Sequence, residues 1–127
     1  MANLYVAIYK PVGGNVHHWA LWLEASTWSR LFEANAGGNP GEYVVSEREN
    51  VRPNASGRHK SNRFVAQIDD YNGFIKNARS CKAPADSAAW NCQEYVLDVL
   101  EAANLDDIID DYQHAAIKGY LESIHDT

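Results

Sequence analysis

The segment Trp-Asn-Cys-Gln-Glu-Tyr-Val-Leu-Asp-Val-Leu-Glu-Ala-Ala, residues 90–103, carries the strongest helical pattern of the chain. Its apolar side chains recur at spacings of three and four residues: Cys92, Tyr95, Val96, Val99, Leu100 and Ala103. Such a stripe is typical of a helix that packs one face against a core. Two further helices are expected over 70–79 and 109–124. In the second, the pattern predicts that one set of side chains faces inward: Ile109, Tyr112, Ala116, Tyr120 and Ile124.

The residues before this helical third alternate or cluster as strands do. Strands are predicted over the ranges 4–9, 16–24, 28–35, 42–46 and 63–68. A turn is expected over 36–41 and a linker over 81–86, and the polar stretch 48–62 is interpreted as an exposed loop, with a lid as the alternative. Strands followed by helices indicate one α+β domain over residues 1–127, with an antiparallel sheet or partial barrel packed on the cysteine-bearing helix.

Composition narrows the classes of partner. Seventeen acidic against eleven basic residues give a net charge of −6, which argues against nucleic acid and anionic membranes. No apolar run approaches the roughly 20 residues that span a bilayer, and the first residues lack the basic region of a signal peptide. We therefore expect a cytoplasmic protein in which Cys81 and Cys92 are thiols.

No metal or cofactor is expected. His17 and His18 are adjacent, so their side chains diverge on a strand, and Cys81 and Cys92 lack the spacing of a zinc site.

Cys92 lies where a helix start can activate a thiol. Asn91 is a favourable N-cap, and Glu94 completes the sequence signature of a capping box. In the first turn, free backbone N–H groups and the positive end of the helix dipole favour a thiolate and can stabilise an oxyanion. The backbone N–H of Cys92 is one expected donor, with Asn91 lining the substrate. A buried structural cysteine is the alternative interpretation.

A cysteine nucleophile requires a base, and His18 is the best-placed histidine. It lies on a predicted strand, on the face that Trp22 would wall off from water. Glu33 and Asn35 share a face of the next strand, and either could orient the imidazole. We prefer Glu33, with Asn35 as the alternative, because a register shift of one residue exchanges the faces. Tyr5, Tyr9 or Asn15 could supply a second oxyanion donor.

These residues resemble the arrangement of a known superfamily. His-Trp-Ala-Leu-Trp-Leu-Glu (18–24) on an early strand, followed by Asn-Cys-Gln (91–93) at a helix start, is similar to the circularly permuted papain-like proteins. The lecithin:retinol acyltransferase-like proteins and the PPPDE desumoylating isopeptidases share this histidine-first order, and in the former the cysteine also follows an asparagine. Residues 90–100 also resemble small fungal proteins with a Trp-Asn-Cys-Gln helix start. The similarity covers residues 16–103 in order and spacing. One departure is that the acyltransferases have histidine where Glu33 aligns.

The resemblance implies a thiol-dependent hydrolase or acyl transferase that forms a thioester on Cys92, with His18 as base and Glu33 as its orienting residue. A small molecule, a peptide or another acyl compound would be the substrate. No membrane anchor follows the last predicted helix, so a substrate within a lipid bilayer is not expected. The competing hypothesis is a binding domain that keeps the fold without the chemistry.

Overall fold

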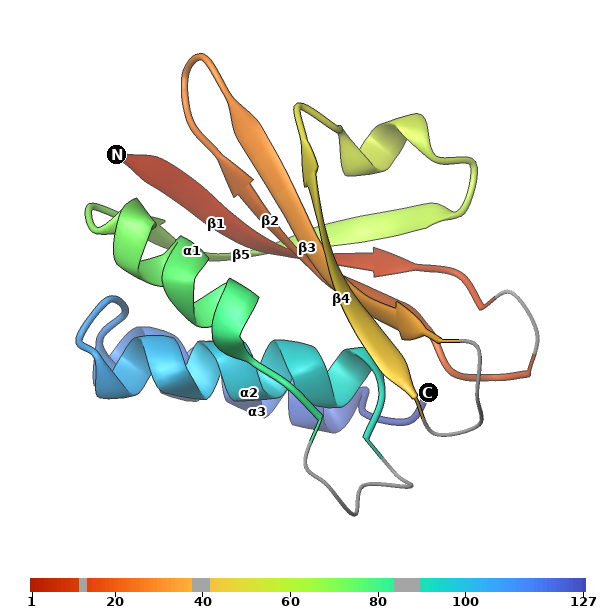
Figure 1. The fold of residues 1–127 in the computed structure, drawn as a ribbon. Coiled ribbons are helices and arrows are strands. Elements are labelled where there is room, and N and C mark those ends of the chain that lie inside the picture. The colour runs from red at the N-terminus through yellow and green to blue at the C-terminus, as the bar shows by residue number, and fades with distance from the viewer. Residues whose placement is uncertain (12–13, 38–41, 84–89) are drawn as a thin grey trace.

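A computed structural model describes residues 1–11, 14–37, 42–83 and 90–127. Five strands form one open antiparallel sheet, and these strands are β1 (Ala2–Tyr9), β2 (His18–Glu24), β3 (Ser29–Ala36), β4 (Tyr43–Glu49) and β5 (His59–Ile68). Their order across the sheet is β4-β3-β2-β1-β5 (Figure 1). The expected antiparallel α+β architecture is confirmed, and the sheet takes the open form rather than that of a partial barrel.

Three helices cover one face of the sheet: α1 (Tyr71–Ser80), α2 (Cys92–Leu105) and α3 (Asp111–Ser123) (Figure 1). The main core lies between them and the sheet, because alternate strand residues such as Val6, Trp19 and Leu21 point toward the helices. Tyr95 of α2 donates a hydrogen bond of 2.7 Å to the carbonyl oxygen of Ala78, which joins α2 to α1. The cysteine-bearing helix therefore packs against both the sheet and its neighbouring helix. None of the described helices is long and apolar enough to cross a bilayer.

The other face of the sheet is covered by the connection between β4 and β5, residues 50–58. Because β4 and β5 are opposite edges of the sheet, this connection must cross its whole width. It contains the short 3-10 helix η1 (Pro53–Ala55). Trp22 Nε1 donates a hydrogen bond of 3.1 Å to the carbonyl oxygen of Val51, which fixes the connection to β2.

Two predictions need correction. The polar stretch 48–62 is not one loop, since β4 continues to Glu49 and β5 begins at His59. The inward face predicted for the last helix is wrong for Tyr112, which is 83% exposed, and for Ala116. The buried residues of α3 are Ile117 and Leu121, because the helix begins only at residue 111 and turns a different face to the core. The predicted turn over 36–41 and linker over 81–86 lie largely outside the described residues.

Candidate active site

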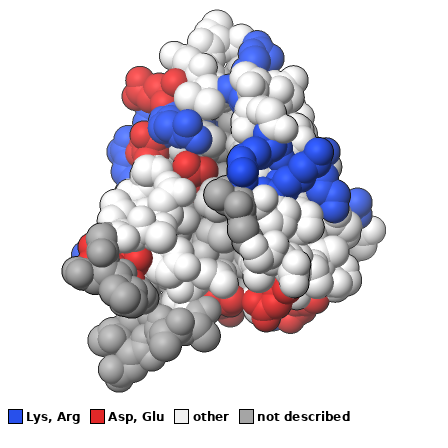
Figure 2. Space-filling view, turned by 90° about the vertical axis from the view of Figure 1, so that its right-hand side faces the viewer, with Lys and Arg blue, Asp and Glu red and all other residues white. Residues whose placement is uncertain are grey.

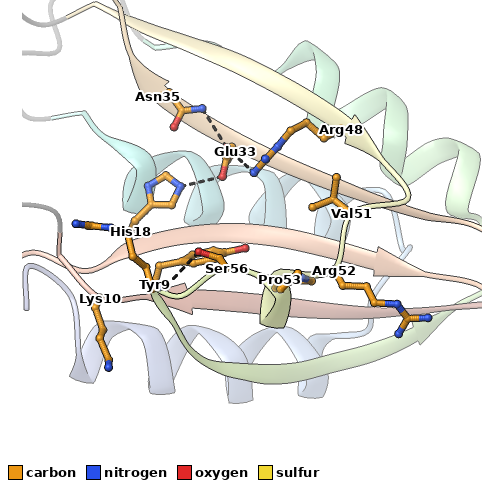
Figure 3. A pocket seen from close by; sticks show the side chains of 12 residues that line it. Tyr9, Lys10, His18, Glu33, Asn35, Arg48, Val51, Arg52, Pro53 and Ser56 are labelled. Atoms are coloured by element: carbon orange, nitrogen blue, oxygen red, sulfur yellow. Dashed lines mark hydrogen bonds and ion pairs between the residues drawn. The ribbon is translucent and has the colours of Figure 1, made fainter.

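His18 is the first residue of β2 and lies opposite Tyr9 in the register with β1. The alternation of the strand places Trp19 in the main core and His18 on the opposite face, beneath the connection 50–58. Its Nε2 lies 3.0 Å from Oε2 of Glu33. This contact connects β2 with β3 and defines one end of the site (Figure 3).

Glu33 is a buried carboxylate whose hydrogen-bond partners favour its charged form. It is 8% exposed, and its Oε1 accepts hydrogen bonds of 3.2 Å from Asn35 Nδ2 and from a guanidinium nitrogen of Arg48. Burial alone would raise the pKa of Glu33, but the hydrogen bonds from His18 and Asn35 and the positive charges of His18 and Arg48 lower it. Glu33, rather than Asn35, therefore contacts the histidine, and Asn35 positions Glu33.

Cys92 begins α2, as the sequence predicts. The Asn91 side chain accepts hydrogen bonds from the backbone N–H groups of Gln93 and Glu94, at 2.9 and 3.3 Å. The reciprocal half of the predicted capping box is absent, because Glu94 instead bonds His125 at 2.5 Å. Within the described part of the chain, the backbone N–H of Cys92 has no acceptor. This N–H remains free to bind an oxygen atom of a ligand.

Cys92 lies close enough to the His18 ring to influence the pKa of that ring. Burial would lower the pKa of His18, but the hydrogen bonds and negative charges of Cys92 and Glu33 outweigh it and raise that pKa to about 9. Because Glu33 binds Nε2, Nδ1 is the ring nitrogen that remains for the thiol. Of the three residues predicted as catalytic, His18 and Glu33 are in direct contact, and Cys92 lies near the same ring.

Gln93 is a site residue that sequence reasoning missed. Of the described residues, only two charged or amide side chains are buried, Glu33 and Gln93. Gln93 Nε2 donates a hydrogen bond of 2.9 Å to the carbonyl oxygen of His17, and its Oε1 accepts one of 2.8 Å from the backbone N–H of Asp126. His17 in turn donates its backbone N–H to the carbonyl oxygen of Thr127 at 2.9 Å. The Gln93 side chain therefore connects the residue after Cys92 to His17, the residue before His18.

A cavity of about 460 Å³ opens beside His18, under the connection 50–58 (Figure 3). Its wall contains Tyr9, Lys10, His18, Glu33, Asn35, Arg48, Val51, Arg52, Pro53, Ala55, Ser56 and Arg58. Burial and the negative charge of Glu33 raise the pKa of Tyr9 to about 12, so its hydroxyl stays a hydrogen-bond donor at neutral pH. Cys92 is not one of the residues of this wall. Basic residues in the wall were not anticipated, because they come from segments whose proximity only the fold creates.

The residues predicted to line the substrate lie elsewhere. Trp22 shares the sheet face of His18 but holds the connection at Val51 and borders a separate depression of about 190 Å³. Asn91 serves as the N-cap of α2. Of the candidate oxyanion donors, Tyr9 lines the cavity, Tyr5 packs against Trp22, and Asn15 is exposed.

The described residues contain one group with metal-ligand chemistry, Glu94, His125 and Asp126, whose ligand atoms lie within 4.8 Å of one another. Both ring nitrogens of His125 already face carboxylates, Nε2 that of Glu94 and Nδ1 that of Asp126. This arrangement is an ion-pair cluster, and it does not border the cavity. Cys81 and Cys92 are both free thiols, as expected.

The structure is an α+β domain in which a histidine and a buried glutamate meet at one end of an antiparallel sheet, close to a helix that begins with a cysteine. Comparison of the sequence with protein families matches residues 4–110 to a family of unknown function (DUF6540). The match covers most of the chain, and the protein belongs to this family. No curated protein and no solved structure matches it.

Proposed function

We propose that the protein is a thiol-dependent hydrolase or acyl transferase with a circularly permuted papain-like fold. The observation that carries the proposal is the contact of His18 with the buried carboxylate of Glu33, next to a helix that begins with Cys92. The order of the elements supports it, since a histidine strand precedes a helix that begins with the cysteine. The buried carboxylate supports it further, because an orienting residue must hold the ring while charge develops.

In the first half of the reaction, the sulfur of Cys92 attacks the carbonyl carbon of an amide or ester. A carbon–sulfur bond forms, and the carbonyl oxygen takes up negative charge. The backbone N–H of Cys92 and the Tyr9 hydroxyl would donate hydrogen bonds to this oxygen. The bond to the leaving amine or alcohol then breaks, and the His18 imidazolium supplies its proton.

In the second half, water or an acceptor amine or alcohol attacks the thioester. His18 takes the proton of this nucleophile, the carbon–sulfur bond breaks, and the sulfur leaves as a thiolate that the regenerated imidazolium stabilises. Hydrolysis and transfer differ only in the second nucleophile. Because Cys92 lies outside the cavity wall, a substrate held there must extend past His18 to present its carbonyl to the sulfur.

Thiol reactivity tests the proposal without knowledge of the substrate. Burial and the charge of Asp98 raise the pKa of Cys81 to about 11, so Cys81 serves as an internal unactivated reference. At pH 6.5, iodoacetamide should modify Cys92 at least about tenfold faster than Cys81, because the thiolate is the reacting species. Single-cysteine variants, Cys81→Ser and Cys92→Ser, assign the fast and slow phases by mass spectrometry.

A fast phase that survives Cys92→Ser, or equal slow modification of both thiols, contradicts the proposal. The second of these results favours the alternative of a binding domain without the chemistry.

A further inference from the structure

The wall of the cavity is strongly basic, although the whole chain is acidic. Four of its residues are cationic, Lys10, Arg48, Arg52 and Arg58, and only Glu33 is acidic. The net charge of the chain is −6. Figure 2 shows the side of the molecule at which β1 ends and β2 begins, with Lys and Arg side chains gathered on its upper half.

Most of these cations have no partner within the described chain. Arg48 is paired, since it contacts Oε1 of Glu33 at 3.2 Å. For Lys10, Arg52 and Arg58, no described acidic residue forms an ion pair. Arg30 and Arg79, by contrast, both bind Glu47 away from the cavity. Positive charge is therefore left unneutralised at the cavity, whereas Arg30 and Arg79 are neutralised.

The backbone holds two of these cations beside each other. The N–H of Lys10 donates a hydrogen bond of 2.8 Å to the carbonyl oxygen of Arg58, where the end of β1 meets the start of β5. Like charges on facing strand residues repel each other. An anion between them removes that repulsion, whereas a neutral ligand does not. The side chains of Lys10, Arg52 and Arg58 are all exposed. In Figure 3, those of Lys10 and Arg52 extend outward from the cavity. Their long stems allow them to turn toward a bound anion.

We infer that the cavity binds the anionic part of the substrate, a carboxylate or phosphate group attached to the acyl compound that Cys92 attacks. This inference rests on the proposed function, because it assigns a substrate class to the same site. Lys10, Arg52 and Arg58 bind the anion as a group. Arg48 stays with Glu33, so the anion does not compete for the residue that orients His18.

Two alkylating agents of nearly equal size test the inference. Iodoacetate and iodoacetamide both transfer a methylene carbon to the Cys92 sulfur and release iodide, but only iodoacetate carries a carboxylate. We expect the iodoacetate-to-iodoacetamide rate ratio of Cys92 to exceed that of Cys81 by about tenfold at low salt, because a cationic cleft concentrates anions. The excess should fall severalfold in about 0.5 M NaCl through screening.

Variants test whether Lys10, Arg52 and Arg58 cause the excess in the rate ratio of Cys92. The triple variant Lys10→Gln, Arg52→Gln, Arg58→Gln should lose the excess, because it removes the charges that concentrate anions at the cavity. Lys76→Gln on α1 removes one charge at an exposed position away from the cavity and should change neither rate. A ratio for Cys92 equal to that of Cys81, with fast iodoacetamide reaction, overturns the inference and leaves the proposed function intact. Slow reaction of Cys92 with both agents overturns the proposed function instead.

A binding experiment distinguishes a carboxylate from a phosphate ligand and does not depend on the reaction of the thiol. The His18 ring signals are followed by NMR during titration with succinate, inorganic phosphate and neutral succinamide. Saturable shifts with succinate or phosphate, absent with succinamide and lost in the triple variant, support the inference and show which anion is preferred. Absence of a saturable shift with both anions, or an equal response to succinamide, contradicts it.

Discussion

Oε2 of Glu33 lies 3.0 Å from Nε2 of His18, and the other carboxylate oxygen is held by Asn35 and Arg48. Because both oxygens are occupied, the carboxylate cannot rotate away from the ring. The ring therefore keeps one orientation, with Nε2 facing Glu33. The arrangement fixes a histidine on a strand relative to a cysteine on a helix.

Replacing Glu33 by Gln should lower the pKa of His18 below its value of about 9, because the neutral amide removes one of the charges that raise it. The iodoacetamide rate of Cys92 at pH 7 should fall by at least about tenfold, since the ring loses its orientation. NMR titration of the His18 ring measures the first effect. Glu49→Gln on β4, where the side chain is 66% exposed, is the matched control and should leave both values unchanged. An unaltered His18 titration in Glu33→Gln would remove Glu33 from the site.

Stability should depend on pH between 6.5 and 9. His18 binds its proton more tightly in the folded chain, so this stabilisation is complete below pH 6.5 and is lost as the pH rises through about 9. The loss should be at most about 3 kcal/mol by the usual conversion of pKa to free energy. Urea unfolding at pH 6.5, 7.5 and 9 measures it, with His18→Asn as the variant that lacks this dependence. If the free energy of unfolding changes equally with pH in wild type and in His18→Asn, the raised pKa of His18 is contradicted.

Variants at the cap of α2 should separate helix stability from thiol reactivity. Asn91→Asp keeps an oxygen that can accept from the N–H groups of Gln93 and Glu94, so the free energy of unfolding should change little. Its carboxylate next to Cys92 disfavours the thiolate, and alkylation at pH 6.5 should slow severalfold. Asn91→Ser keeps a neutral cap and should resemble wild type in both respects. Asn91→Ala should lose about 1 kcal/mol of stability. If the Asp and Ser variants react at the same rate, charge at this helix start does not govern Cys92.

Gln93→Ala should destabilise the protein by about 1–3 kcal/mol, because it leaves the His17 carbonyl and the Asp126 N–H without their partner. Gln93→Met retains most of the volume and should still slow Cys92 alkylation, which separates the hydrogen bonds from packing. The exposed Gln67 on β5 provides the control, since Gln67→Ala should cost no more than about 0.5 kcal/mol. Urea unfolding and alkylation rates of the three variants make the comparison. If Cys92 is alkylated in Gln93→Met at the wild-type rate, the hydrogen bonds of Gln93 do not position the site.

Local patterns predicted the parts of the site that local physics determines. The strand pattern predicted Glu33 as the partner of His18, with the register left to the structure, and the capping preference of Asn91 placed Cys92 at a helix start. Glu94 shows the limit of such reasoning: the signature of a capping box is present, but a histidine from beyond α3 binds the carboxylate instead.

The other features of the site depend on contacts between segments that are far apart in the sequence. No pattern in residues 48–62 reveals that β4 and β5 occupy opposite edges of the sheet, so neither the crossing of 50–58 nor the cavity beneath it could be predicted. Gln93 reads as an ordinary polar residue of a helix start, because its partner His17 lies 76 positions away.

The hydrogen bonds around Gln93 also determine when the site forms during folding. They join residues 17, 93, 126 and 127, so they close only after the chain has been synthesised as far as residue 127. Contacts of such large sequence separation form late, since the loop between them must be ordered first. A nascent or partly folded chain therefore carries Cys92 as an ordinary thiol. Under the proposed function, the reactivity of Cys92 is therefore coupled to the completion of folding.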